Sequence, residues 1–264
     1  MLILLPPSEG KTPPTPSAPL DLAPLDLATL SFDGLTRTRR EVLSALIRFC
    51  SSEPATAATA LGLGPTQAGH VQANASLKRA PAGPAIDVYT GVLFEALDAG
   101  SLRAAERRRL NRLVAISSAL FGLVRPDDLI PAYRLSGDTR LPALGTMPAV
   151  WREHVSGELA QQQGVILDLR SGSYVALGPI PPGIAGRTVV GRVLHEHEGK
   201  RSIVSHHNKA TKGRIVRSLA QATTHPKTIA DLIDVLEALG YQAELQAPGR
   251  QGAPAIVDII VGEV

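Results

Sequence analysis

The segment 118–135, SALFGLVRPDDLIPAYRL, holds the charged residues whose spacing most clearly suggests chemistry. An apolar run leads into Arg125, Asp127 and Asp128, and Arg134 follows nine residues after the first arginine. Charged groups are rarely buried without partners, so we expect these side chains to line a cleft. Because guanidinium groups bind phosphate and carboxylate well, the cleft should attract anions. The two aspartates then serve either as a general acid–base pair or, in the interpretation that we favour, as ion-pair partners that keep the arginines rigid.

A second basic group, Lys209, Lys212, Arg214 and Arg217, follows a segment at 201–206 that we expect to be a strand. Helical spacing places Lys209, Lys212 and Arg217 on a shared side of the next helix. A lysine in the first turn opposes the helix dipole, so we interpret Lys209 as a residue that meets an anion. The simpler alternative is a solvated basic helix.

Lys11 belongs to the segment SEGK at 8–11, directly after a short apolar strand predicted at 2–5. Ligands of α/β proteins tend to bind beyond the carboxyl ends of strands, so this segment is a further candidate for the cleft. The glycine and lysine spacing of a Walker motif is absent. Nucleotide hydrolysis by that route therefore has no support.

The segment 61–68, LGLGPTQA, resembles the turn of a helix–hairpin–helix motif. Gly62 and Gly64 let the backbone turn tightly, and the second helix would present unpaired N–H groups at its start. Such groups bind a phosphate without reading bases. An ordinary loop between two helices is the alternative.

The predicted helix at 102–113 is rich in arginine and permits two interpretations. Its basic side chains either follow the backbone of a nucleic-acid duplex or form a solvated face that pairs with Glu106 and nearby acids. The arginines are Arg103, Arg107, Arg108, Arg109 and Arg112.

Histidines on two predicted strands raise the question of a metal. His195 and His197 alternate onto one face, and His206 would lie near them if 201–206 pairs with their strand. Three such nitrogens suit a metal ion, but no cysteine or His–Glu ligand motif accompanies them, and exposed strand histidines are the alternative. We expect no metal and no cofactor.

The order of the strands and helices that must position these residues predicts a mixed α/β (α+β) fold. Strands occur first, in the middle and last, with helices between them, so we expect a single compact domain over 1–264 around one central mixed sheet. A helical insertion with the hairpin-like turn is expected at about 35–113. The predicted helices are 35–50, two within 55–79, 90–99, 102–113, 148–163, 209–222 and 226–239, and the predicted strands are 2–5, 165–169, 187–194, 201–206, 241–246 and 255–261.

The composition narrows the protein class. The chain has 264 residues, is 44% hydrophobic and carries a formal net charge of +3, so a packed core and a mildly basic surface are expected. Aromatic residues make up only 3%, which disfavours base stacking as the way of holding single strands. The one cysteine, Cys50, fits a reducing compartment. With no signal peptide and no apolar run long enough to span a bilayer, we expect a soluble, cytoplasmic protein.

Four motifs in order resemble the YaaA family of peroxide stress proteins: 1–11, 89–91, 118–135 and 205–214. The resemblance implies a compact α/β protein that binds DNA in a positively charged cleft and contains a helix–hairpin–helix. Ala119 and Phe121 stand where relatives often have glycine and tyrosine, and Ser173 stands where an acid often precedes the tyrosine. The cleft residues that the resemblance implies are Lys11, Tyr89, Arg125, Arg134, Tyr174, Lys209 and Lys212.

Two functions follow as hypotheses. The first is a peroxide stress protein that binds double-stranded or damaged DNA through phosphates, without sequence preference, and limits iron- and peroxide-driven damage. The second is an enzyme, glycosylase-like or lyase-like, that acts on damaged nucleic acid or a phosphorylated nucleoside, with Lys209, Asp128 and Tyr174 as candidate catalytic residues. Iron binding through the histidines is a third idea. No membrane and no obligate protein partner are expected.

Overall fold

The apolar segment that opens the chain forms an inner strand of an eight-stranded sheet, β1 (Leu2–Leu5). Its neighbours on both sides, β3 and β8, run parallel to it, with Leu4 opposite Ala115 on one side and Asp168 on the other. All four residues of β1 are buried. A continuous apolar run is what a strand covered on both faces requires, because neither face meets water.

The sheet is mixed, with parallel strands inside and antiparallel strands at its edges. Its order is β11-β12-β9-β8-β1-β3-β4, and β10 pairs with β9 off this path. The central five strands are parallel, whereas β11, β10 and β4 are antiparallel to their neighbours. Besides β1, its strands are β3 (Val114–Ser118), β4 (Gly122–Val124), β8 (Ile166–Asp168), β9 (Thr188–His197), β10 (Lys200–Ser202), β11 (Gln242–Gln246) and β12 (Ala255–Val261); β2 (Gly83–Pro84) with β5 (Leu129–Ile130) and β6 (Arg140–Leu141) with β7 (Gly145–Thr146) form two small ladders.

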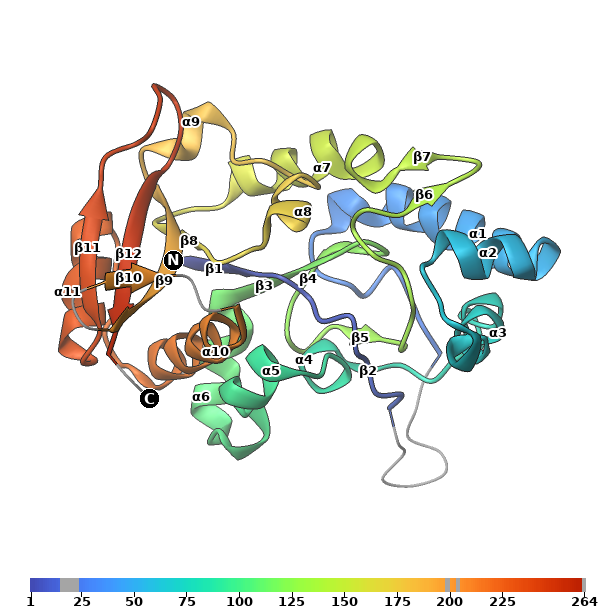
Figure 1. Cartoon of the computed structure of the whole chain (residues 1–264), viewed down its shortest axis with the longest axis horizontal. Helices are drawn as coiled ribbons and strands as arrows, with labels where there is room; N and C mark the ends of the chain where they lie inside the picture. The colour runs from blue at the N-terminus through green and yellow to red at the C-terminus, as the bar shows by residue number, and fades with distance from the viewer. Residues whose placement is uncertain (15–23, 198–199, 203–204, 263–264) are drawn as a thin grey trace.

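Helices cover both faces of the sheet in this computed structural model, which describes residues 1–14, 24–197, 200–202 and 205–262. In Figure 1, α5, α6 and α10 lie below the sheet, α7, α8 and α9 lie above it, and α1, α2 and α3 lie at its right-hand end. The helices are α1 (Thr36–Ser52), α2 (Pro54–Ala60), α3 (Gly69–Ala75), α4 (Ala85–Val88), α5 (Val92–Leu97), α6 (Ala104–Leu113), α7 (Met147–Gln161), α8 (Gly172–Val175), α9 (Pro182–Ala185), α10 (Ser205–Gln221) and α11 (Ile229–Ala238).

The expected fold class is confirmed: one compact mixed α/β domain with a central mixed sheet. The stretch between β1 and β3 holds α1 to α6 together with the short β2. One prediction was wrong. The segment 201–206 is not one strand, because β10 ends at Ser202 and α10 already begins at Ser205, which places His206 in a helix. No helix within the described ranges is long and apolar enough to cross a membrane.

A fully buried arginine on α1 fixes the loop between β3 and β4. The Arg39 guanidinium donates to the carbonyl oxygens of Phe121 (3.0 Å), Leu123 (2.7 Å), Ser31 (2.6 Å) and Leu30 (3.4 Å). Burial lowers the pKa of Arg39 to about 10, and nearby carboxylates oppose this. The planar, five-donor guanidinium suits such a cluster of carbonyls better than a lysine would.

We expect Arg39→Met to destabilise the protein by about 3 kcal/mol or more, because several buried carbonyl oxygens would lose their donors at once. Urea denaturation measures the change. Arg37→Met on the same helix is the matched control, since the Arg37 side chain is 90% exposed, and it should shift the midpoint little. Equal losses in both variants would contradict the role assigned to Arg39.

Candidate functional site

A cavity of about 580 Å³ lies where the parallel strands β1 and β8 end. Because neighbouring parallel strands share a carboxyl edge, the segments that follow them meet there. The residues after β1 and after β8 form two walls, the start of α5 forms a third, and α10 closes the cavity with lysines. The lining comprises Pro6, Pro7, Ser8, Glu9, Gly10, Thr90, Gly91, Val92, Leu93, Phe94, Ser171, Ser173, Tyr174, Asn208, Lys209 and Lys212.

The Glu9 carboxylate joins three segments at this edge. Arg134 Nη1 lies 2.9 Å from Glu9 Oε2 in an ion pair. Tyr174 Oη donates to Glu9 Oε1 at 3.2 Å, and Ser136 Oγ donates to the same oxygen at 3.3 Å. Burial first, and then the Glu9 charge, raise the pKa of Tyr174 well above its usual range. Tyr174 is therefore a neutral hydrogen-bond donor at physiological pH.

Lys11 lies behind Glu9, against aromatic rings. Its Nζ donates to the Ser8 carbonyl oxygen at 2.9 Å and lies 4.3 Å from the Tyr133 ring centroid and 5.4 Å from that of Tyr89. Desolvation lowers the pKa of Lys11 to about 8; Glu9 opposes the shift and Arg134 adds to it. A cation–π contact stabilises the ammonium less than hydration in bulk water does.

A chain of hydroxyl groups lies beneath Lys11 and ends at β3. The Tyr89 and Tyr133 hydroxyls are 2.9 Å apart, and the Tyr133 hydroxyl is 2.7 Å from Ser118 Oγ. Ser118 Oγ also accepts from the Phe121 N–H at 2.9 Å. Burial raises the pKa of Tyr89 to about 12 and raises that of Tyr133 well above its usual range, so both phenols keep their protons. The chain fixes both rings that contact Lys11.

The two lysines of α10 reach the first cavity from the opposite side. Lys212 Nζ donates to the Leu169 carbonyl oxygen at 2.9 Å, and burial lowers the pKa of Lys212. Lys209 is exposed and lines the same cavity. Gly213 lets α10 approach α5 closely, since a Cβ there would fall 2.2 Å from the Leu93 carbonyl oxygen. This close approach sets the distance between the lysines and the opposite wall.

Two side-chain atoms near the site are buried without a hydrogen-bond partner among the described residues. Asn208 Oδ1, an acceptor, lines the first cavity, and Arg134 Nε, a donor, belongs to a residue that lines a smaller hollow nearby. Buried polar groups are nearly always paired, so atoms of this kind often await a ligand or water.

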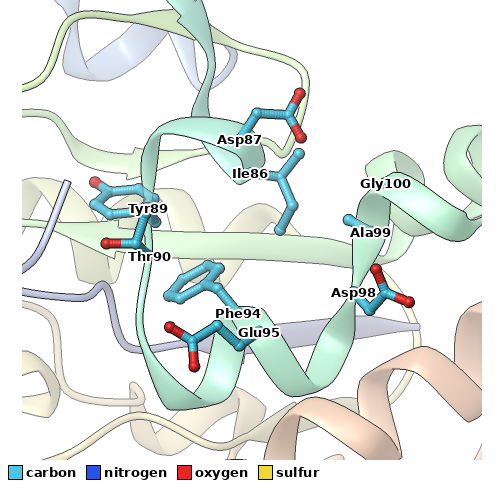
Figure 2. Close-up of a pocket in the computed structure, with 9 residues that line it drawn as sticks. All are labelled: Ile86, Asp87, Tyr89, Thr90, Phe94, Glu95, Asp98, Ala99 and Gly100. Carbon is cyan, nitrogen blue, oxygen red and sulfur yellow. The ribbon is translucent and has the colours of Figure 1, made fainter. Parts of the chain in front are cut away.

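A hollow of about 260 Å³ beside the first cavity has the opposite charge (Figure 2). Its wall includes Tyr89 and Phe94, whose stacked rings have centroids 5.4 Å apart. Figure 2 shows that the carboxylates of Asp87, Glu95 and Asp98 point in different directions. Acidic groups that diverge neither attract phosphate nor form a metal-binding cluster.

Arg125 does not reach the cavity, which corrects the expected cleft. β4 runs antiparallel to β3, with Ile116 opposite Val124, so the chain leaves β4 at the amino edge of the parallel strands. There Arg125 Nη1 donates to the carbonyl oxygens of Arg112 (2.9 Å) and Val114 (3.1 Å). Of the arginines in 118–135, Arg134 alone reaches the carboxyl edge.

The aspartates are also placed differently from expectation. The buried Asp128 carboxylate accepts from the Ser31 N–H, from Ser31 Oγ (2.8 Å) and from the Arg125 N–H (2.8 Å). Asp127 pairs with Arg107 at 3.1 Å. Asp128 therefore fixes a loop, which fits the rigid role, but through Ser31 and a backbone N–H rather than through arginine side chains. The candidate catalytic residues Lys209 and Tyr174 do line the cavity, and Asp128 does not.

The hairpin-like turn affects the site through α3, the helix that follows it. Gly62 has φ 63°, and the Gly64 N–H donates to Gln67 Oε1 at 3.2 Å. On α3, the fully buried Asn74 donates to the Arg134 carbonyl oxygen at 2.7 Å and accepts from the Arg134 N–H at 2.9 Å. The turn thereby helps to position Arg134, while both glycines and Arg214 lie outside the lining of the cavities described here.

Three arginines, one just before α6 and two on it, bind other groups of the protein. Arg107 pairs with Asp87 at 3.0 Å as well as with Asp127, and Arg103 pairs with Glu106. Arg109 donates to the carbonyl oxygens at the end of α10. Paired charges of this kind fit the solvated or structural alternative better than a continuous track for a duplex.

The histidines do not form a three-nitrogen site in the described parts of the chain. The rings of His195 and His207 meet edge to face, with centroids 5.2 Å apart. Burial first, and then His207, lower the pKa of His195. The side chain of His206 lies outside the described residues. Among the side chains that are described, no group of three histidine, cysteine or acidic residues is placed to hold a metal ion.

Three residues that shape the site were not predicted from the sequence: Glu9, Ser118 and Asn74. Glu9 and Ser118 lie inside the quoted motifs, so their position after β1 and at the end of β3 was an available signal. Asn74 had no such signal, because its partners are backbone atoms 60 residues away.

Comparisons with known proteins give a consistent result. A family model described as "Peroxide stress protein YaaA" matches residues 1–247. A UPF0246 protein from Streptomyces coelicolor is 44% identical over 266 residues, which cover all of both chains. A UPF0246 protein from Corynebacterium efficiens is 41% identical over 261 residues, covering 97% of this chain and all of that relative.

The lowered pKa of Lys11 predicts a pH-dependent difference in stability. From pH 8 towards the ordinary value of 10.5, the unfolded chain binds a proton at Lys11 that the folded chain has released, so this group makes stability rise with pH. The free energy of unfolding of the wild type minus that of Lys11→Met should therefore increase over this range. Urea denaturation at several pH values measures it, and parallel curves would contradict the burial of the amine.

Proposed function

The chain belongs to the family of the peroxide stress protein YaaA, which supports a role in the response to peroxide, and we propose that it acts there by binding DNA through phosphates. In this proposal the protein works in the cytoplasm and limits iron- and peroxide-driven damage to the DNA that it covers. The observation that carries the proposal is the convergence of Lys209 and Lys212 on one cavity at the carboxyl edge of the sheet.

The size and charge of this cavity favour contact with a single nucleotide unit. Its volume of about 580 Å³ lies within the range of pockets for small ligands, roughly 300–1,000 Å³. A duplex does not enter such a space, whereas one phosphate or one extruded nucleotide does. The exposed Lys209 and the half-buried Lys212 would meet the phosphate, and such contacts carry no sequence information.

A second candidate function is an enzyme that acts on damaged nucleic acid or on a phosphorylated nucleoside. The observation that favours it is Lys11, an amine held against two tyrosine rings beside a carboxylate, with a pKa of about 8. Binding a phosphate backbone requires no such group, and strongly shifted pKa values are characteristic of active sites. Tyr174 and Lys209 remain candidates on the adjoining cavity.

Phosphate binding predicts a measurable salt dependence. The affinity for a duplex, measured by fluorescence anisotropy, should fall linearly in log–log form with salt concentration, and Lys209→Ala should lessen the slope by about 0.9, the loss of one phosphate contact. Lys212→Met should weaken binding in the same direction.

Lys227→Ala is the control, because Lys227 is exposed and lies outside the lining of this cavity. Affinity that barely changes with salt would contradict the proposal. So would an equal loss of affinity in the Lys227 and Lys209 variants.

A further inference from the structure

A second hollow, of about 270 Å³, also borders the segment after β1, and we call it the smaller hollow because its volume is below that of the first cavity. Glu9 lines both this hollow and the larger cavity, so the two are neighbours across one segment. The side chains that matter in the smaller hollow are those of Lys11, Tyr133, Arg134 and His70, the last of them from α3. The hollow therefore combines an amine, a guanidinium and an aromatic wall in a space smaller than the first.

The surroundings of Lys11 are those of a nucleophile rather than of a structural ion pair. In the described part of the chain, its Nζ has one hydrogen-bond acceptor, the Ser8 carbonyl oxygen, and two aromatic neighbours. The nearby Glu9 carboxylate is already held by Arg134 and Tyr174. Within the described ranges Lys11 forms no ion pair with a carboxylate. A lysine in a desolvated site next to another cation is the arrangement that enzymes use to obtain a reactive amine.

The reactive fraction of this amine is substantial at neutral pH. With a pKa of about 8, roughly one-tenth of Lys11 is neutral at pH 7, about 300-fold more than for a lysine with the ordinary pKa of 10.5. A neutral lysine amine reacts with carbonyl carbons to give Schiff bases.

We propose that Lys11 forms a Schiff base with the aldehyde of an abasic deoxyribose in DNA. This inference rests on the proposed DNA binding and specifies the damaged substrate of the site. An intact nucleotide offers no carbonyl carbon in its sugar, whereas a sugar that has lost its base opens to an aldehyde at C1′. A sugar without a base also suits the smaller hollow.

A neighbouring group supports the identity of this substrate. Arg134 Nε is a buried donor without an acceptor among the described residues, and Arg134 lines the same hollow as Lys11. An abasic sugar in a strand is flanked by phosphates, and a guanidinium donor close to the amine is suited to one of them.

The chemistry balances without a cofactor. The neutral Nζ adds to C1′, the carbonyl oxygen gains a proton, and the carbinolamine takes a second proton from solvent and loses water, which leaves a protonated imine. The imine makes the C2′ hydrogen acidic. A base such as the Glu9 carboxylate removes that proton, and the electron pair of the broken C2′–H bond forms the C2′–C3′ double bond. The 3′-phosphate leaves with the electron pair of the C3′–O bond. Water then hydrolyses the imine and restores the amine.

The test is reductive trapping with the full-length protein. A duplex with one abasic site, the same duplex with an intact base, and free 2-deoxyribose 5-phosphate are each incubated with protein and sodium cyanoborohydride, which reduces an imine to a stable amine. We expect a covalent adduct with the abasic duplex only, located at Lys11 by peptide mass spectrometry. We also expect at least a tenfold loss of adduct in Lys11→Met.

Controls separate this inference from the proposed function. Lys227→Met should trap as the wild type does, and the wild-type protein should bind the intact duplex with the salt dependence expected of the proposed function. Peptide mapping of the wild-type adduct identifies the reacting residue even if Lys11→Met does not fold.

Three outcomes would overturn the proposal. They are the absence of an adduct although the intact duplex binds with the expected salt dependence, an adduct on another lysine, and an adduct with the free sugar phosphate alone. The first leaves DNA binding in place and removes only the Schiff base. Loss of all duplex binding would instead remove the proposed function on which the DNA substrate depends.

Discussion

The arrangement of the site depends on one carboxylate. Glu9 accepts hydrogen bonds from Arg134 and Tyr174, and so ties the segment after β1 to the segments at 133–136 and 171–174. Because the carboxylate is shared in this way, Lys11, two residues further on, is left with a carbonyl oxygen and aromatic rings as its neighbours. The same interaction therefore assembles the cavity wall and leaves the Lys11 amine without a carboxylate partner among the residues that the structure describes.

Arginines and lysines have different roles in this protein because their side chains differ in geometry. Arg39, Arg125 and Arg109 use their several planar donors to hold backbone carbonyl groups, and they serve the fold. The lysines at the site, Lys11 and Lys209, are single-point cations that line open spaces. A guanidinium satisfies a cluster of carbonyls, whereas an ammonium changes its pKa readily when buried, which suits a ligand site.

The helices between β1 and β3 act on the site at a distance. Asn74 on α3 makes two hydrogen bonds to the backbone of Arg134. Phe94, whose ring stacks on that of Tyr89, lines both the acidic hollow and the cavity that holds the lysines. The hairpin-like turn before α3 thus has a structural consequence whatever it binds. A shift of these helices would move Arg134 and, through the ion pair, Glu9.

The sequence by itself determined the mixed α/β class and the buried strand at 2–5, and it placed Lys11 directly after that strand, because apolar periodicity and the position of a residue after a strand are local properties. Tyr174, Lys209 and Lys212 were assigned to the cleft by the family resemblance. Only the tertiary structure decided which charges meet. Arg125 lies at the amino edge of the parallel strands because β4 runs antiparallel to β3. Asp128 bonded to Ser31, and Arg134 to Glu9, 125 residues away. Strand direction and register bring such partners together, and no local pattern encodes them.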